Sequence, residues 1–173
     1  AWFNPTINSY KRINAPVTAS GATWSPNTIT YSGNNRTHMI RVPGSGRFEL
    51  RLMDGATNPY LLQAGILAAG IDGIEKKRNP GRPVNVNMYE DAHKVKGAKK
   101  LPLSLSQALN NLDKSKVLKS AFGKDVINSY ITLKNREIKK YNSSKGKKIG
   151  FKGAKSNKSN LITQWERDNT LDC

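Results

Sequence analysis

A strict alternation of charged and apolar residues constrains the fold more than any other feature of this sequence. Residues 47–52 read Arg-Phe-Glu-Leu-Arg-Leu, and a period of two predicts a β-strand with two unlike faces. The charged face carries Arg47, Glu49 and Arg51, and the apolar face carries Phe48, Leu50 and Leu52. We expect the apolar face to pack on a core. Residues 37–42 resemble a partner strand, and the Pro-Gly-Ser-Gly run at 43–46 supplies the turn of a hairpin.

Helical patterns follow the hairpin. Asn58 and Pro59 form a helix start, since Asn caps free amides and Pro fits the first helical position. Ser104 and Gln107 have the spacing of a capping box. The predicted helices cover about 58–77, 104–112, 117–122 and 125–140, with one or two turns at 161–168. Residues 4–16 are expected to form a loop or short helical turn, and 79–103 a loop. The fold class is therefore α+β, antiparallel strands packed with several helices.

The net charge narrows the classes of partner that the protein can bind. A net charge of +17 in 173 residues suits nucleic acid, an anionic surface or phosphorylated ligands. Residues 139–158 hold eight lysines and no acid, which would allow a basic nucleic-acid-binding module. A solvated low-complexity segment is the favoured interpretation, because no nucleic-acid-binding motif is present, and 142–160 is predicted to be a mobile insert. No apolar run is long enough to cross a membrane, and the single cysteine, Cys173, suits a reducing, cytoplasmic location.

The arginines near the hairpin form the candidate site. Four of them fall within sixteen positions around a single acid, Glu49: they are Arg36, Arg41, Arg47 and Arg51. Such a cluster repels itself unless anions approach it, so we predict a site for phosphates and carboxylates, with Glu49 as a candidate metal ligand. By parity Arg36 and Arg41 do not share a strand face, so a bulge or strand end must intervene. His38 and His93 lack neighbours at metal-ligand spacing and are expected to be structural or on the surface.

Four motifs in order resemble one family. They are NPTINSYKRIN at 4–14, NNRTHMIRVP at 34–43, RFELRLMDGATNPYL at 47–61 and TQWERDNTLDC at 163–173. Together they resemble the C-terminal part of the catalytic domain of a glutamine synthetase, in the bacterial branch called type III or T-type. The family makes γ-glutamyl phosphate from glutamate and ATP with Mg²⁺ or Mn²⁺, and ammonia then displaces the phosphate.

The resemblance implies a role for each charged residue of the motifs. Glutamate would be bound by Arg12, Arg36 and Arg51. ATP would be bound by Arg36, Arg41 and Arg47, with Arg36 also acting catalytically on the transferring phosphoryl group. Glu49 would bind the metal ion. Phosphoryl transfer depends mostly on positioning and charge neutralisation, which guanidinium groups and a metal provide.

Departures from the family pattern set the remaining expectations. The active-site flap is shortened to residues 12–16, which leaves ammonia, methylamine or another small amine open as the acceptor. The lysine common before the RFELR strand is replaced by 44–46. The N-terminal β-grasp domain and the strands with the other metal ligands are absent. We therefore expect an inactive fragment made of catalytic-domain segments at 1–141 and 161–173, which at full length would form homo-oligomeric rings.

Overall fold

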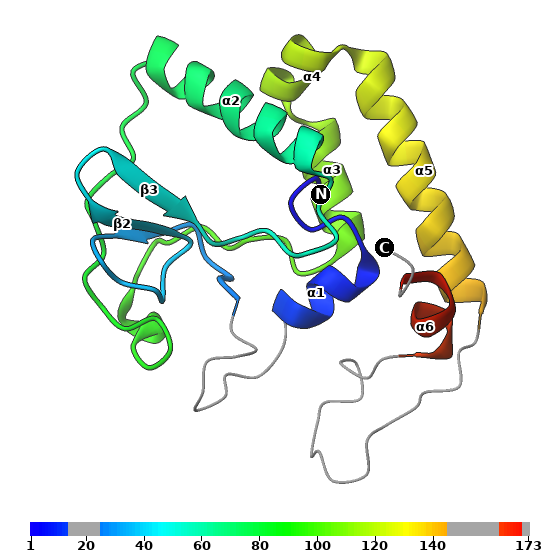
Figure 1. Ribbon diagram of the computed structural model, residues 1–173, viewed down its shortest axis with the longest axis horizontal. Coiled ribbons are helices and arrows are strands. Elements are labelled where there is room, and N and C mark those ends of the chain that lie inside the picture. Colours follow the sequence, from blue (N-terminus) through cyan, green and yellow to red (C-terminus); the bar gives the residue numbers. More distant parts are fainter. Residues whose placement is uncertain (14–24, 145–162, 171–173) are drawn as a thin grey trace, which may run out of the picture.

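The computed structural model describes residues 1–13, 25–144 and 163–170, and places a small sheet at one end and helices at the other (Figure 1). The strands are β1 (Tyr31–Ser32), β2 (Ile40–Gly44) and β3 (Arg47–Leu50). The helices are α1 (Ile7–Ile13), α2 (Pro59–Glu75), α3 (Leu105–Asp113), α4 (Lys116–Phe122), α5 (Lys124–Ser143) and α6 (Gln164–Thr170), with a 3₁₀ turn, η1, at Ala92–Lys94. The α+β class is confirmed.

The sheet contains the predicted hairpin with shorter strands. β2 pairs antiparallel with β3 and parallel with β1. Arg41 lies opposite Glu49, and the register is irregular between Arg41 and Gly44. Gly46 closes the turn at φ 73°, a backbone conformation that side chains other than glycine rarely adopt. Arg36 lies before β2 begins, so a strand end separates it from Arg41, as parity required.

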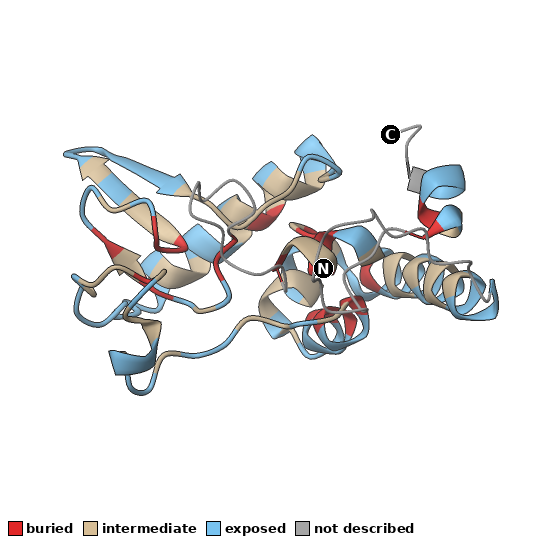
Figure 2. Cartoon of the chain, turned by 90° about the horizontal axis from the view of Figure 1, so that it is seen from below, coloured by how far each residue is buried: buried red, intermediate tan, exposed pale blue. Residues whose placement is uncertain are grey.

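The expected packing of the apolar strand face is wrong at Phe48, which is 60% exposed. Leu50 and Leu52 are half-buried. Figure 2 shows that much of the hairpin surface is exposed or intermediate, whereas buried residues lie among the helices, in the first residues of the chain and in the segment before β2, which includes His38 and Met39. A sheet of three strands has two broad faces, and no described element covers Phe48. Alternation alone therefore predicted the strand but not what covers it.

The long helix after the hairpin begins as predicted. The Asn58 side chain accepts hydrogen bonds from the amides of Tyr60 and Leu61 at 3.0 and 3.1 Å. α2 then lies with its N-terminal half near the chain start, and Gly65 is its one buried residue. A Cβ at Gly65 would meet the Trp2 and Phe3 rings at 3.3 Å, so the helix packs closely on the first residues of the chain. Ile74 near its other end is 80% exposed, because the helix extends beyond the core (Figure 1).

Helices α1, α3 and α5 hold the main core. Ser104 caps α3 through the Gln107 amide, while the Gln107 side chain accepts from the amide of Leu103. One cluster of buried side chains joins α1 to α3 and comprises Tyr10, Ile13, Leu105, Ala108 and Leu109. A second cluster comprises Trp2, Leu112 and Ile127. The predicted break between α4 and α5 lies at Gly123, whose φ is 83°.

The two short segments near the chain ends are helical. Residues predicted as a loop or short helical turn form α1, and the predicted turn after 161 forms α6. Trp165 of α6 packs edge-on against Tyr141 of α5 with ring centroids 5.4 Å apart, which anchors α6 to α5. Most of the lysine-rich segment predicted to be a mobile insert lies outside the described residues.

Candidate functional site

The Arg41–Glu49 pair is the centre of the charged cluster. The two residues face each other across β2 and β3, and Arg41 Nη1 donates to Glu49 Oε2 at 2.8 Å. The Arg41 Nε donates to Asn34 Oδ1 at 2.9 Å, so the guanidinium is held from two sides. The Arg41 side chain is only 14% exposed, whereas that of Glu49 is 46% exposed. The carboxylate is therefore open to solvent and the arginine behind it is fixed.

Three arginines act on the Glu49 carboxylate. The hydrogen bond from Arg41 holds the pKa of Glu49 below its usual range, and the charges of Arg41, Arg51 and Arg36 lower that pKa further. Partial desolvation works in the opposite direction. Glu49 is thus ionised at neutral pH, and its Oε1 has no hydrogen bond among the described residues. A carboxylate oxygen surrounded by guanidinium groups fits a divalent cation that also carries phosphate oxygens.

Arg47 and Arg51 extend the cluster along β3. Arg47 is exposed at the start of the strand, opposite Gly44, and makes no ion pair among the described residues. Arg51 follows the strand end, and its amide donates to the carbonyl of Met39 at 2.8 Å. The hairpin therefore presents arginines at both ends of the strand that carries Glu49.

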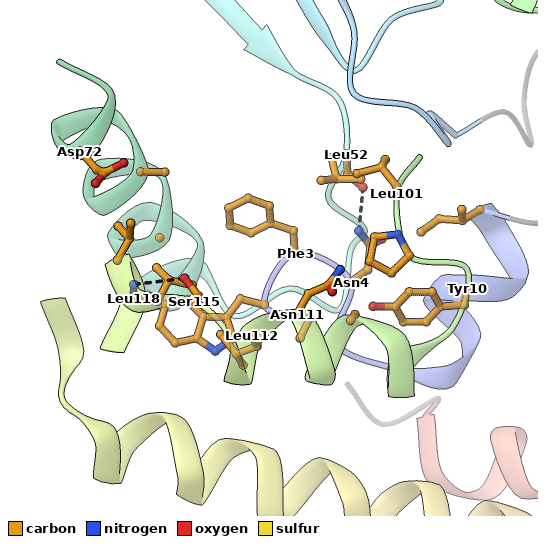
Figure 3. A pocket seen from close by; sticks show the side chains of 18 of the residues that line it. Phe3, Asn4, Tyr10, Leu52, Asp72, Leu101, Asn111, Leu112, Ser115 and Leu118 are labelled. Carbon is orange, nitrogen blue, oxygen red and sulfur yellow. Dashed lines mark hydrogen bonds between the residues drawn. The ribbon is translucent and has the colours of Figure 1, made fainter. Parts of the chain in front are cut away.

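Arg12 reaches the same strand end from α1. One of its terminal nitrogens donates to Asn4 Oδ1 at 3.0 Å and to the carbonyl of Leu52 at 2.8 Å. The Asn4 amide also donates to Leu52, at 3.2 Å (Figure 3). Burial lowers the pKa of Arg12, and the nearby charge of Asp54 partly opposes that shift. The buried Nε has no hydrogen-bond acceptor, so the guanidinium is oriented but not fully satisfied.

The two histidines have the roles expected of them. His38 is fully buried, with ring nitrogens 3.0 Å from Thr30 Oγ1 and 3.0 Å from the carbonyl of Val86. His93 is exposed in η1. Within the described ranges no three His, Cys, Asp or Glu side chains gather as a metal cluster, so Glu49 is a single candidate ligand.

A cavity of about 540 Å³, drawn in Figure 3, is separate from the charged cluster, because neither Glu49 nor the arginines around it line the cavity. It runs between α2, α3 and the first residues of the chain, and Leu52 and Asn4 line its edge. Most of its lining is apolar, including Trp2, Phe3 and Leu112. The charged cluster instead lies on the open surface of the hairpin, where the Glu49 side chain is 46% exposed.

Sequence reasoning missed the residues that hold the arginines in place. Asn34 fixes Arg41, and Asn4 fixes Arg12. Lys11 and Glu166, which join α1 to α6, were also missed. Both asparagines lie within the quoted motifs, so the motifs were the available signal; a single amide has no spacing pattern of its own.

The structure thus shows an α+β domain whose hairpin carries a cluster of arginines around Glu49. Comparison with known proteins gives the family. The family model described as the glutamine synthetase catalytic domain matches residues 1–148, and the chain belongs to that family.

Relatives and solved structures agree with this assignment. A glutamine synthetase of Rhizobium leguminosarum bv. phaseoli is 54% identical over 169 residues, which are 98% of this chain and 35% of that protein. A glutamate–methylamine ligase of Methyloversatilis universalis is 46% identical over 140 residues, 79% of this chain and 31% of that protein. A solved GmaS/ADP complex has a TM-score of 0.77 at 50% identity and covers all of this chain and 36% of its own. The chain thus spans about a third of the length of these relatives.

Proposed function

We propose that the polypeptide containing this chain is a glutamine synthetase, an ATP-dependent glutamate–ammonia ligase that acts through γ-glutamyl phosphate. The observation that carries the proposal is the ionised Glu49, paired with Arg41 and influenced by Arg36 and Arg51. Family membership supplies the reaction class. Assignment to the type III or T-type branch belongs to the same proposal and rests on the motifs.

The arginines divide between the two anionic substrates in this proposal. Arg12 and Arg51 approach one end of β3 and would hold the carboxylates of glutamate. Arg41 and Arg47 would hold the phosphates of ATP. Arg36, whose charge acts on Glu49, would neutralise the phosphoryl group in transfer and contact both substrates. Guanidinium groups bind carboxylate and phosphate oxygens in bidentate fashion, which gives geometry as well as charge.

Glu49 fits the divalent ion that the family requires. Its Oε1 is open, and its low pKa keeps it ionised without bound metal. Mg²⁺ or Mn²⁺ bound there would neutralise charge on the phosphate oxygens. Other ligands would come from ATP, water and protein groups beyond the described residues, because one carboxylate does not fill the coordination shell of such an ion.

A glutamate–methylamine ligase is the second candidate. The shortened flap leaves the amine acceptor open, and one relative at 46% identity carries that name. The solved GmaS structures are 45–50% identical to this chain. The arginine cluster serves either reaction equally, because both activate glutamate in the same way and differ only in the amine that attacks.

A basic nucleic-acid-binding module remains the candidate from another class. Its proposed surface, 139–158, lies largely outside the described residues. Retention on DNA or RNA that weakens as the salt concentration rises would support this candidate. Failure to bind at every salt concentration would reject it. Ring assembly and a cytoplasmic location are proposed with the ligase; no helix among the described residues is long and apolar enough to span a membrane.

The test is an assay of the complete translation product that contains these residues. Phosphate release from ATP should require glutamate, Mg²⁺ or Mn²⁺, and an amine. A glutamine synthetase should show kcat/KM for ammonia about tenfold or more above that for methylamine, since one methyl group in a fitted site is worth about 10- to 200-fold. The reverse preference would establish the methylamine ligase, and absence of glutamate-dependent turnover would reject both.

The chain of residues 1–173 is the matched comparison for that assay. It should release no phosphate above background, because Glu49 alone cannot assemble a site for several metal ions. Robust turnover by this chain would contradict the expectation that the remaining ligands lie elsewhere.

A further inference from the structure

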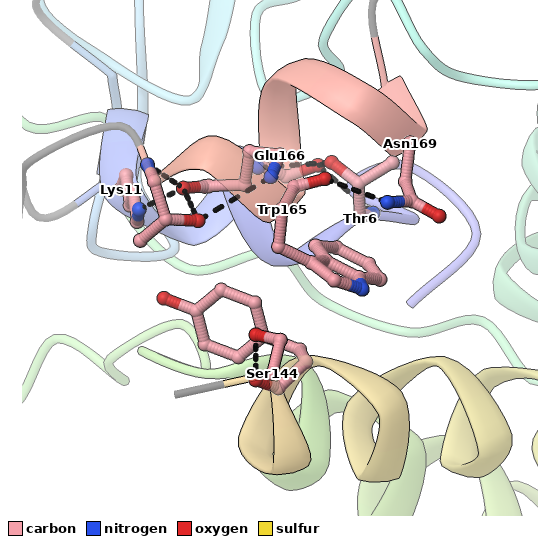
Figure 4. Close-up of polar contacts among 9 residues, drawn as sticks. Thr6, Lys11, Ser144, Trp165, Glu166 and Asn169 are labelled. Atoms are coloured by element: carbon pink, nitrogen blue, oxygen red, sulfur yellow. Dashed lines mark hydrogen bonds and ion pairs between the residues drawn. The ribbon is translucent and has the colours of Figure 1, made fainter. Parts of the chain in front are cut away.

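The junction of α1, α5 and α6 contains a buried ion pair outside the charged cluster (Figure 4). Lys11 of α1 donates to Glu166 Oε2 of α6 across 155 positions of sequence. The side chains are 11% and 1% exposed. Removing one partner of such a buried pair leaves the other charge buried and uncompensated, which is strongly destabilising.

The Glu166 carboxylate is oriented by Thr163, the residue that precedes α6. Its Oε2 accepts from the Thr163 amide at 2.7 Å and from Thr163 Oγ1 at 2.9 Å. The Glu166 amide in turn donates to Thr163 Oγ1 at 3.3 Å, which completes a capping box. Trp165 packs against Tyr141 of α5, and Lys11 Nζ lies 5.8 Å from the centre of the Tyr141 ring. The acceptor for Lys11 is therefore a fixed point on the body of the domain.

Helix α1 needs such a fixed point. It has seven residues, and helices this short are marginal in water without tertiary contacts. Tyr10 and Ile13 fix its depth against α3, but apolar contacts are not directional. Lys11 and Arg12 are consecutive, so any rotation of α1 that moves Lys11 from Glu166 also moves Arg12 from Leu52 and Asn4.

We propose that Glu166, through Lys11, is a positioning residue for Arg12, and thereby sets the affinity of the site for glutamate. This inference rests on the proposed function, in which Arg12 binds a carboxylate of glutamate. Arg41, which would hold ATP phosphates, is instead bound by Glu49 and Asn34, within and beside the hairpin. Loss of the ion pair should therefore affect glutamate and spare ATP.

The experiment compares variants of the complete translation product by steady-state kinetics. Lys11→Met removes the ammonium and keeps an unbranched stem, and Glu166→Gln keeps the size and the capping acceptor in case Lys11→Met does not fold. Each should raise KM for glutamate about tenfold or more, the range seen when the partner of a binding group is lost. KM for ATP should stay within about twofold. Lys11→Arg, which keeps the charge, should recover most of the affinity.

Lys119→Met is the control, since Lys119 forms an ion pair with Asp113 away from α1. It should leave both KM values unchanged. A purely structural role for Lys11 would lower kcat with both KM values unmoved, and that result would overturn the inference. So would equal rises in both KM values, or a Lys11→Arg variant as impaired as Lys11→Met. A wild type without glutamate-dependent turnover would overturn the proposed function as well, whereas an active wild type with insensitive variants overturns this inference alone.

Discussion

At the scale of single residues, the Arg41–Glu49 ion pair on the hairpin contributes little to stability. Arg41 and Glu49 are opposite in register, but Glu49 is nearly half exposed. Exposed ion pairs stabilise folds little, because water competes for both partners. The ion pair leaves Glu49 Oε1 open. Arg41 is also held by its hydrogen bond to Asn34. Removing the Glu49 carboxylate should therefore weaken the proposed metal binding without unfolding the domain.

Glu49→Ala should lower metal-dependent turnover by about 100-fold or more, since it removes the proposed ligand of the ion that would neutralise phosphate charge. Titration of the complete translation product with Mn²⁺ should show weaker binding, with a thermal unfolding midpoint close to that of the wild type. Glu75→Ala is the matched control, because Glu75 is an exposed acid at the end of α2. Unaltered Mn²⁺ affinity in Glu49→Ala would reject Glu49 as a ligand.

Much of the site at this scale could be predicted from residue type and spacing. Clustered arginines around one acid indicated an anion site, and the structure brings Arg36, Arg41 and Arg51 to bear on Glu49. Asn4 and Asn34 could not be predicted from spacing, because an amide oxygen can accept from any nearby donor. Phe48 was misplaced because alternation separates two faces without saying which face is covered.

At the scale of elements, periodicity predicted which segments are helical better than it predicted their buried faces. Val126 and Ile127 both fit the apolar pattern of α5, yet Val126 is 49% exposed and Ile127 is fully buried against Trp2 and Leu112. A helix presents about 100° of rotation between neighbours, so adjacent apolar residues cannot both face one partner. The caps at Asn58 and Ser104 were predictable because they depend only on local sequence.

Ile127→Ala should lower the free energy of unfolding by about 2–5 kcal/mol, the range for an aliphatic side chain removed from a packed core. Val126→Ala, at the preceding position of α5, should change the free energy of unfolding by less than about 1 kcal/mol. Urea denaturation of the complete translation product measures both, provided that unfolding is two-state. Similar losses for the two variants would mean that α5 is rotated relative to the arrangement described.

At the scale of the whole molecule, one buried histidine links the sheet to a distant loop. His38 lies next to β2 and contacts the carbonyl of Val86 as well as Thr30. Burial lowers the pKa of His38 from its ordinary value of 6.5, and the hydrogen bond to Val86 opposes that shift. The unfolded chain therefore binds a proton more readily than the folded one, so stability falls as pH drops below the ordinary value.

His38→Gln should remove that part of the pH dependence, since Gln can donate and accept but does not titrate. The free energy of unfolding of wild type should fall between about pH 7.5 and about pH 5.5 more steeply than that of the variant. Other acids and bases titrate in both proteins and cancel in the difference. Equal slopes would show that His38 protonates as easily in the folded protein as in the unfolded chain.

The order of synthesis gives the Lys11–Glu166 contact one more consequence. Its partners are separated by 155 positions, so a ribosome has released Lys11 long before Glu166 leaves the exit tunnel. The hairpin and the contacts of α5 with α3 and α4 can form as these segments emerge, since they join elements that are near each other in sequence. The orientation of α1, and with it of Arg12, is completed last. A nascent chain would thus fix the arginines of the hairpin before it fixes Arg12.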